Sequence, residues 1–314
     1  MKVSSFLPAA THMIYDLGLD QYLDGITFEC PPKALEEKQV VVRCVLEGKE
    51  YSSEEIDRIF SASKAQGKSL YYVEDEILQS IQPDIIFTQD VCEVCQIDTE
   101  CTARAVAKLD KMPELIPLTP QSLQDVFDCL ITIAKAMGYE ERAYTLMADI
   151  NERMNGITDR LRKHRAPLRR VSLLEWFDPI YNCGHWIPHQ IGYAGGIDML
   201  SNPSGDSIVI DWDKIVRYDP EVLIVAPCGF DVKRTLAEMH LLTQRKGWEE
   251  LTAVKNGEVY VADFDLFTQP SAGTIIQGIE LMACLIHPEV FDLSHALSAK
   301  CVRLMDLDNA KIHA

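Results

Sequence analysis

Three cysteines of the sequence can share one metal ion. Cys92 and Cys95 form a CxxC pair, and Cys30 follows an earlier predicted strand. Thiolates in such a set are typical zinc ligands, and Cys228 or Cys183 can complete a tetrahedral site. The same pair also fits a redox-active dithiol, or thiols that lie in a core or line a pocket. Zinc binding is therefore one of three interpretations of this cluster.

An imidazole is the second group with metal chemistry. Gly184, His185 and Trp186 are consecutive, and a histidine in a glycine loop can ligate the cobalt or iron of a bound chelate. A structural histidine with satisfied ring nitrogens is the alternative. Asp90 and Glu93 can act as acid and base, but no nucleophile or electrophile accompanies them.

Catalytic and phosphate-binding motifs are absent from the sequence. It contains no GxSxG elbow, no GxxxxGK[ST] loop, no HExxH pair and no complete GxGxxG fingerprint. We therefore expect a binding protein and not an enzyme. A zinc-dependent or thiol-dependent enzyme on the same scaffold is the alternative.

Aromatic, polar and sulfur-containing side chains gather where predicted strands end. These loops are residues 8–12, 28–30, 89–95, 176–186, 227–230 and 263–269. In sheets built from strand–helix units, ligands bind beyond the carboxyl ends of the strands, and two such lobes facing each other make one cleft. The residues expected to contact a ligand are Ala9, Thr11, Phe28, Glu29, Gln89, Asp90, Glu93, Trp176, Tyr181, His185, Trp186, Cys228, Phe230 and Phe267. Trp212 and Trp248 lie away from these loops and are expected to be structural.

An internal repeat indicates how the loops are positioned. Residues 77–87 and 214–225 both follow the pattern of a helix, a proline-acid turn and a buried strand, and residues 13–20 resemble 191–198. The repeated segments keep the same order in both halves. The fold class is therefore α/β, with two Rossmann-like lobes.

A helical connection is expected between the lobes. Residues 122–138 keep helical spacing of apolar side chains without an internal breaker, and a second helix follows at about 140–163. We expect one long backbone helix beginning near Ser122, and a stiff connection that allows little hinge motion. The predicted division is 1–120 for the N-terminal lobe, 121–167 for the helices and 168–314 for the C-terminal lobe and its tail.

Charge and composition exclude some partners. The chain has 314 residues, a net charge of −18 and a pI near 4.8, so it would repel the phosphates of nucleic acid. No stretch approaches the roughly 18–20 apolar residues of a membrane span. The N-terminus lacks a basic region followed by an apolar core, so we expect a cytoplasmic protein, or a periplasmic one only if a signal peptide was removed.

Several segments together resemble one known family: the cobalamin-binding members of the periplasmic-type substrate-binding proteins with a helical backbone (class III), which serve ATP-driven ABC importers. The segments are 5–11, 25–30, 69–95, 174–176 with 184–188, 226–230 and 256–260. The helical insertion at 51–67, placed before the third strand, is typical of one subgroup. Ser52 and Glu55 in it have capping-box spacing.

The resemblance implies that the ligand is cobalamin or a related corrinoid lying in the cleft, and that the partner is an importer permease. Phe28, Gln89, Tyr181, Trp186 and Phe267 match ligand-facing positions of the family. It also implies that the ligand brings its own metal. Phe28 stands where many relatives have histidine, and Gln269 and Thr274 replace expected arginines, so haem and iron–siderophore complexes are the alternative ligands.

Overall fold

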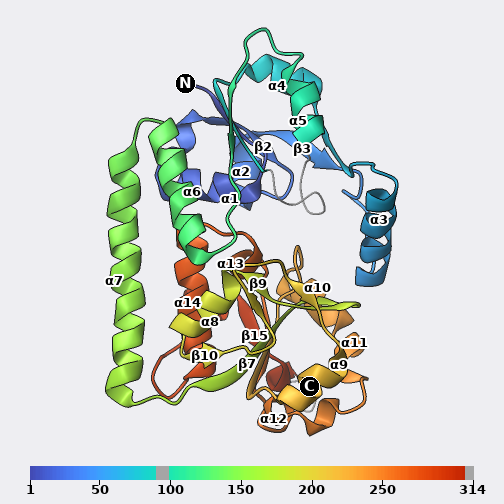
Figure 1. Cartoon of the computed structure of the whole chain (residues 1–314), viewed down its shortest axis with the longest axis vertical. Helices are drawn as coiled ribbons and strands as arrows, with labels where there is room; N and C mark the ends of the chain where they lie inside the picture. Colours follow the sequence, from blue (N-terminus) through green and yellow to red (C-terminus); the bar gives the residue numbers. More distant parts are fainter. Residues whose placement is uncertain (90–98, 308–314) are drawn as a thin grey trace. The chain divides into compact units, whose positions relative to one another are not determined.

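Two large sheets organise the described chain, each in its own compact unit, and a two-stranded sheet of order β11-β9 accompanies them. The computed structural model describes residues 1–89 and 99–307, with no side-chain description for 99–101. The N-terminal lobe comprises Met1–Pro120, Asp125–Met147 and Ser271–Gly273, and the C-terminal lobe comprises Gln121–Gln124, Ala148–Pro270 and the chain from Thr274 onward. Each lobe combines a sheet with helices (Figure 1), which confirms the predicted fold class of two α/β lobes.

The N-terminal lobe contains a six-stranded sheet of order β4-β3-β2-β1-β5-β6. Its strands are β1 (Val3–Ser5), β2 (Leu23–Thr27), β3 (Gln39–Cys44), β4 (Tyr71–Val73), β5 (Ile85–Thr88) and β6 (Glu114–Pro117). Its helices are α1 (Pro8–Asp16), α2 (Pro32–Glu37), α3 (Ser53–Ala65), α4 (Asp75–Ile81) and α5 (Thr99–Val106). All strand pairs are parallel except β3 with β4.

Parallel strands buried on both faces need nearly continuous apolar runs, and β5 meets this requirement because all four of its residues are buried. A short helix follows β1 directly, since Pro8 occupies the first turn of α1, where its missing N–H costs nothing. The carboxyl ends of β1, β2 and β5 therefore lie side by side, and the loops 8–12, 28–30 and 89–95 start there.

The C-terminal lobe repeats this arrangement around parallel strands β7, β13 and β14. Its strands are β7 (Arg169–Phe177), β8 (Ile180–Asn182), β9 (Gly184–His185), β10 (Gly196–Ile197), β11 (Asn202–Pro203), β12 (Ile208–Val209), β13 (Val222–Val225), β14 (Val259–Ala262) and β15 (Cys301–Arg303). Its helices are α8 (Ile187–Tyr193), α9 (Trp212–Tyr218), α10 (Val232–Glu238), α11 (His240–Thr243), α12 (Thr252–Lys255), α13 (Asp265–Thr268), α14 (Ala272–Ile286) and α15 (His295–Ser298). The antiparallel strands β8 and β15 flank the parallel core.

The internal repeat is real at the level of backbone geometry. α4 ends at Gln82, with φ 50°, before β5, and α9 ends at Asp219, with φ 49°, before β13. Both residues are therefore left-handed caps between a helix and a buried central strand. The Asp219 carboxylate also accepts hydrogen bonds from the backbone and hydroxyl of Thr252, both at 2.7 Å.

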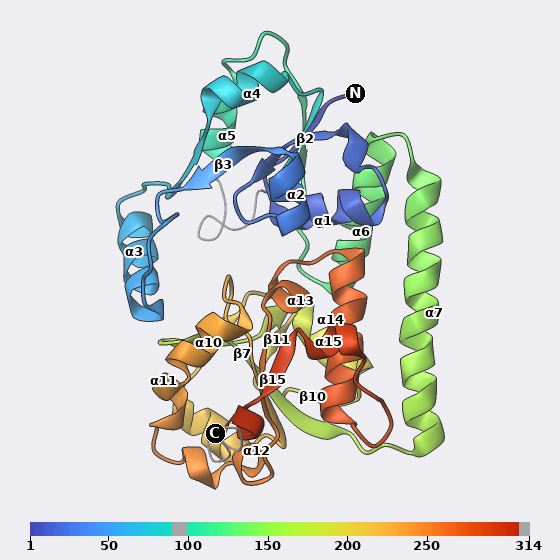
Figure 2. The ribbon, with the colours of Figure 1, turned by 180° about the vertical axis from the view of Figure 1, so that it is seen from behind.

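The helical connection contains the two helices that the sequence predicts. α6 (Leu123–Ala136) begins near Ser122 as expected and has 14 residues, and α7 (Glu140–His164) has 25. The predicted division between residues 138 and 140 is confirmed, and Gly138, with φ +80°, ends the first run. Only the placement of the long helix at Ser122 was wrong, because α7 is the longer of the two. Figures 1 and 2 trace α7 as one continuous helix.

α7 contributes contacts to both lobes along its length. Its first turns belong to the N-terminal lobe, where Arg142 donates to the carbonyls of Leu17 and Gly18 at 3.0 and 2.8 Å. Its later turns belong to the C-terminal lobe, where Arg153 pairs with Glu280 at 2.8 Å. Among the described residues, no helix is both long and apolar enough to cross a membrane.

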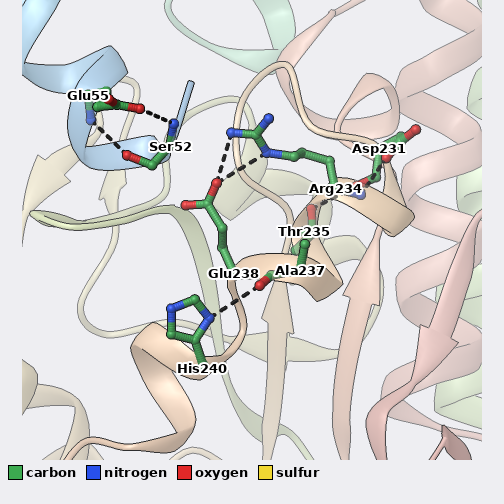
Figure 3. A network of polar contacts seen from close by, with 8 residues as sticks. All are labelled: Ser52, Glu55, Asp231, Arg234, Thr235, Ala237, Glu238 and His240. Carbon is green, nitrogen blue, oxygen red and sulfur yellow. Dashed lines mark hydrogen bonds and ion pairs between the residues drawn. The ribbon is translucent and has the colours of Figure 1, made fainter. Parts of the chain in front are cut away.

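The inserted helix α3 carries the predicted capping box. The Ser52 hydroxyl accepts from the Glu55 N–H at 3.2 Å, and the Glu55 carboxylate accepts from the Ser52 N–H at 2.8 Å (Figure 3). The insertion follows the third strand, β3, so its predicted place before the third strand was wrong. The error arose because the sequence interpretation did not include a strand at Gln39–Cys44.

Candidate functional site

The N-terminal lobe brings two of its predicted loops together at Thr11 and Cys30. Thr11 is fully buried in α1, and its hydroxyl accepts a hydrogen bond from the Cys30 thiol at 3.1 Å. Ala9, two residues earlier, is also buried. Phe28 is half-buried, with its ring centroid 6.3 Å from that of Tyr71 and its side chain packed against the core. These contacts place Thr11 and Cys30 inside the lobe and leave part of Phe28 accessible.

Glu29 and Gln89 are the more accessible members of the N-terminal set. Glu29 is exposed between Phe28 and Cys30, and its N–H donates to the Thr27 hydroxyl at 3.3 Å. Gln89 is half-buried directly after β5. The remaining predicted residues of this lobe, Asp90, Cys92, Glu93 and Cys95, lie outside the described residues.

The Cys30 thiol has the environment of a protonated, structural sulfur. Burial raises its pKa, and hydrogen bonds with Thr11 and Thr27 offset only part of that effect. Within residues 1–89 and 99–307, no group of three or more histidine, cysteine or acidic side chains is arranged to hold a metal ion. The zinc interpretation of Cys30 with Cys92 and Cys95 stays a prediction, because two of its members are not described.

An aromatic pair lies at the carboxyl ends of β7 and β13 in the C-terminal lobe. The rings of Trp176 and Phe230 have centroids 5.1 Å apart, and the Arg234 guanidinium lies 4.5 Å from the Phe230 ring. Trp176 is half-buried, whereas Phe230 is buried. Tyr181 of β8 pairs in register with Trp176 and keeps part of its surface exposed. Cys228 is exposed in the same loop as Phe230.

His185 lies in a strained backbone position beside a buried tryptophan. Its φ is 54°, and its ring stacks on Trp186 with centroids 5.3 Å apart. Nδ1 lies 3.1 Å from the Gln121 amide oxygen, and Nε2 lies 3.9 Å from the Asp206 carboxylate. Burial lowers the pKa of His185, and the nearby Asp206 opposes this change. A neutral, half-buried imidazole with one well-placed neighbour is the result.

Trp186 and Phe267 are core residues in this structure. Phe267 is fully buried, and Trp186 is 8% exposed. The Trp186 indole N–H donates to the Phe267 carbonyl at 2.6 Å, which joins the start of α8 to α13. Neither ring therefore offers a free face in the described ligand-free chain. Trp212 and Trp248, expected to be structural, stack with centroids 6.2 Å apart.

Arg234, in the first turn of α10, pairs through its side chain with Glu238 at the end of the same helix. Asp231 caps this helix by accepting from the Arg234 N–H at 2.6 Å, and the Arg234 side chain pairs with Glu238 at 2.8 Å (Figure 3). The same figure shows the Thr235 hydroxyl donating to the Asp231 carbonyl at 2.9 Å. This guanidinium is therefore neutralised beside the aromatic pair.

Sequence reasoning missed Lys300, a second cationic side chain that pairs with carboxylates near these loops. Its ammonium group lies 3.3 Å from Asp263 and 2.7 Å from Asp265, the acidic residues that follow β14. Burial raises the pKa of Asp263, and Lys300 acts against this. The sequence contained no direct signal for this contact, because Lys300 is remote in the chain and reaches the loop through the antiparallel pairing of β14 with β15.

Two half-buried acidic residues were also missed. Glu175 of β7 accepts from the Ser207 hydroxyl, and Asp198 accepts from the side chain of Asn182 at 3.2 Å. Burial raises the pKa of Glu175 to about 7 and that of Asp198 to about 6. An acidic residue directly after the apolar run 171–174 was the available signal for Glu175.

Four of the six loops at the carboxyl ends of the strands carry acidic residues, and none carries a lysine or arginine. Residues 8–12, 28–30, 89–95, 176–186, 227–230 and 263–269 contain the acidic residues Glu29, Asp90, Glu93, Asp178, Asp263 and Asp265, and no lysine or arginine. Arg234 and Lys300, which reach these loops from outside, are paired with carboxylates.

Comparison with known proteins defines the class of this chain. Residues 66–266, more than half of the sequence, match the family model described as periplasmic binding protein. An ABC transporter substrate-binding lipoprotein, YvrC of Bacillus subtilis (strain 168), is 24% identical over 298 residues, which cover 92% of this chain and 81% of the relative.

Solved structures share the fold. A periplasmic heme binding protein from Pseudomonas aeruginosa has a TM-score of 0.69 at 15% identity, covering 94% of this chain and 96% of its own. The periplasmic vitamin B12 binding protein BtuF of Vibrio cholerae has a TM-score of 0.60 at 17% identity, covering 91% of this chain and 96% of its own. The chain is thus a substrate-binding protein of the kind that serves ABC importers, and it belongs to the periplasmic binding protein family.

The comparison corrects the predicted localisation. A cytoplasmic protein was expected from the residues with which the sequence begins. The relative in Bacillus subtilis is a substrate-binding lipoprotein of a transporter, a class of protein that works outside the cytoplasm. The cytoplasmic prediction was therefore wrong, because the start of a sequence is weak evidence for where a binding protein acts.

Proposed function

We propose that this protein binds cobalamin or a related corrinoid and delivers it to the permease of an ABC importer. The family supports the role of a substrate-binding protein. The solved structures with a similar fold are named for heme, vitamin B12 or iron, or name no ligand, so the choice among them depends on the chemistry of this chain.

The charge of the loops carries the choice of a corrinoid. Heme has two propionate groups, which are ionised at neutral pH and need cationic or hydrogen-bond donors when they are buried. The loops at the strand ends supply acidic residues and no lysine or arginine, and Arg234 and Lys300 are already paired. The side chains around a corrinoid end mainly in neutral amides. The N–H groups of these amides can donate hydrogen bonds to acidic side chains. The same repulsion disfavours anionic iron chelates.

The accessible aromatic side chains are the proposed contacts with the flat ligand. Phe28, Trp176 and Tyr181 each retain exposed surface at a strand end. A planar macrocycle gains apolar burial and ring contacts against such side chains. His185 is the proposed side chain for contact with the ligand's metal. Trp186, Phe230 and Phe267 act behind them as support, because they are buried.

A calorimetric titration with cyanocobalamin, hemin and ferric citrate tests the ligand. We expect cyanocobalamin to bind and hemin to bind at least tenfold more weakly. Tyr181→Ala should weaken cyanocobalamin binding by about 1–2 kcal/mol, since an aromatic contact of this size is lost. Tyr193→Ala is the matched control, because Tyr193 is exposed on α8 and lies outside the loops. Tighter binding of hemin than of cyanocobalamin would reject the corrinoid proposal.

Heme is the second candidate ligand because several solved relatives are named for it. The half-buried imidazole of His185 is a suitable iron ligand. An absorption spectrum of the hemin titration distinguishes coordinated from loosely associated iron. If hemin coordinates through His185, then His185→Ala should abolish the spectral shift.

A further inference from the structure

Glu175 is a buried carboxyl group that the proposed contacts do not use. On β7, Leu174 pairs with Asn182 and Trp176 pairs with Tyr181, so Glu175 is the extra residue of a β-bulge. A bulge re-aims a side chain relative to the regular strand. Here the carboxyl accepts hydrogen bonds from the Ser207 hydroxyl and the Gly184 N–H.

These two donors belong to the segments that present His185. The His185 N–H donates to the Gly205 carbonyl at 2.6 Å, and the Ser204 N–H donates to the His185 carbonyl at 2.9 Å. A Cβ on Gly184 would lie 2.5 Å from both the Gly205 oxygen and the Ser207 nitrogen. The backbone of 205–207 therefore rests directly on Gly184, with no space between them.

The backbone of His185 depends on this support. Its φ of 54° is a left-handed conformation that residues other than glycine rarely adopt. Such a conformation persists only where the surrounding structure holds it. The pairing of β9 with β11 and the carboxyl of Glu175 beneath Gly184 are the described contacts that do so.

The second oxygen of the carboxyl explains why Glu175 retains a proton. Oε1 is buried and has no hydrogen-bond partner. Ionisation would place part of the negative charge on this enclosed oxygen, which no donor of the described chain reaches. Burial therefore raises the pKa of Glu175 to about 7, although the bonds from Ser207 and Gly184 act in the opposite direction.

We infer that Glu175 is a positioning residue for the His185 loop: while protonated, its carboxyl keeps residues 203–208 seated on Gly184, and ionisation draws water in and releases them. The release would weaken ligand binding through His185, a part of the inference that rests on the proposed function. The seating of residues 203–208 is a property of the chain without ligand.

The direction and size of the effect follow from proton linkage. The carboxyl has an ordinary pKa of 4.5 when it is open to water and a pKa of about 7 when it is enclosed, so a bound proton favours the seated arrangement. The proton on Glu175 therefore fully stabilises the seated arrangement below the ordinary pKa of 4.5, and this stabilisation is lost as pH rises through about 7. These values correspond to about a tenfold rise in the opening equilibrium between pH 6 and pH 8.

Other titratable groups surround Glu175, and the experiment must separate them. Cys183 after β8 interacts with Glu175 electrostatically, and the Cys228 N–H donates to the Glu175 backbone carbonyl. His185, Asp198 and Asp206 lie on the neighbouring segments. Burial lowers the pKa of His185 and raises that of Asp198 to about 6. A variant that changes only Glu175 keeps all of these groups.

Hydrogen exchange of the full chain without ligand tests the seating. Peptides covering 201–209 are followed at pH 6 and pH 8 and corrected for intrinsic exchange. We expect their protection to fall about tenfold in the unmodified protein and to change less than twofold in Glu175→Gln, which keeps the size and an acceptor oxygen. Glu221→Gln is the matched control: Glu221 also accepts a backbone hydrogen bond in this lobe, from Arg170 at 2.9 Å, and should leave the pH response intact.

Ser207→Ala provides a second variant if Glu175→Gln does not fold. It removes a donor that favours the carboxylate, so the midpoint of opening should move to higher pH. An equal fall in protection in Glu175→Gln, or no fall in the unmodified protein, overturns the inference.

Cyanocobalamin titrations at pH 6 and pH 8 complete the test. Affinity should be lower at pH 8 in the unmodified protein and equal at both values in Glu175→Gln. Opening without any change in affinity would overturn the positioning role. No binding at either pH would reject the proposed corrinoid function, while the exchange measurement still decides the role of Glu175 in the chain.

Discussion

Replacement of Trp186 should cost the C-terminal lobe stability before it affects any ligand. From the sequence, Trp186 was expected to stack on the ligand, with Trp186→Ala weakening binding by roughly 1–3 kcal/mol. In the structure the ring is 8% exposed, and its N–H donates to the Phe267 carbonyl at 2.6 Å. A large buried ring replaced by alanine leaves a cavity, which typically costs about 3–5 kcal/mol.

Trp186→Phe separates the two parts of this cost. It keeps most of the buried apolar surface but leaves the Phe267 carbonyl without its donor, which costs about 1–3 kcal/mol. We therefore expect the free energy of unfolding to fall in the order unmodified protein, Trp186→Phe, Trp186→Ala. Trp212→Ala is the comparison within the same lobe, with a smaller loss because Trp212 is only half-buried.

Urea unfolding of the ligand-free protein, followed by circular dichroism, measures the effect. Unfolding of the two lobes can separate into two transitions, so the transition of the C-terminal lobe is the one to compare. A loss below 1 kcal/mol in Trp186→Ala, together with a loss of ligand affinity above 1 kcal/mol, would refute the structural role and restore the stacking interpretation.

Three further predictions concern local features. Ser52→Ala should destabilise the start of α3 by about 0.5–2 kcal/mol, seen as faster hydrogen exchange in its first turn, and unchanged exchange there would contradict the capping box with Glu55. Cys30→Ser should leave the metal content of the purified ligand-free protein unchanged, whereas stoichiometric zinc that is lost in this variant would favour the metal interpretation. The Lys111 ammonium, with the backbone of Lys2, lowers the pKa of Asp84, so the ion pair stabilises the folded chain above the ordinary pKa of aspartate and this stabilisation is lost as pH falls. Lys111→Ala should raise the pKa of Asp84 in an NMR titration, and an unchanged pKa of Asp84 would count against the ion pair.

Local patterns in the sequence were sufficient where structure depends on near neighbours. The capping box at Ser52 needs only residues within one helical turn, and the helix–cap–strand units around Gln82 and Asp219 need only short-range spacing. The repeat of those units predicted two α/β lobes. The same patterns predicted two helices divided near Gly138 but placed the long helix at Ser122, whereas α7 is the longer one, because the relative stability of two adjoining helices depends on what each packs against.

The sequence by itself determined the class of fold, the loops at the strand ends and their acidic charge, because strand order and composition follow from short segments. Only the tertiary structure decided what each side chain does. Trp186 and Phe267 are buried against each other, and Lys300 reaches Asp263 and Asp265 through strand pairing. Glu175 became a buried acid because a bulge and the backbone at Gly184 enclose it. Burial and partner choice are set by contacts between residues far apart in the chain, which no local pattern records.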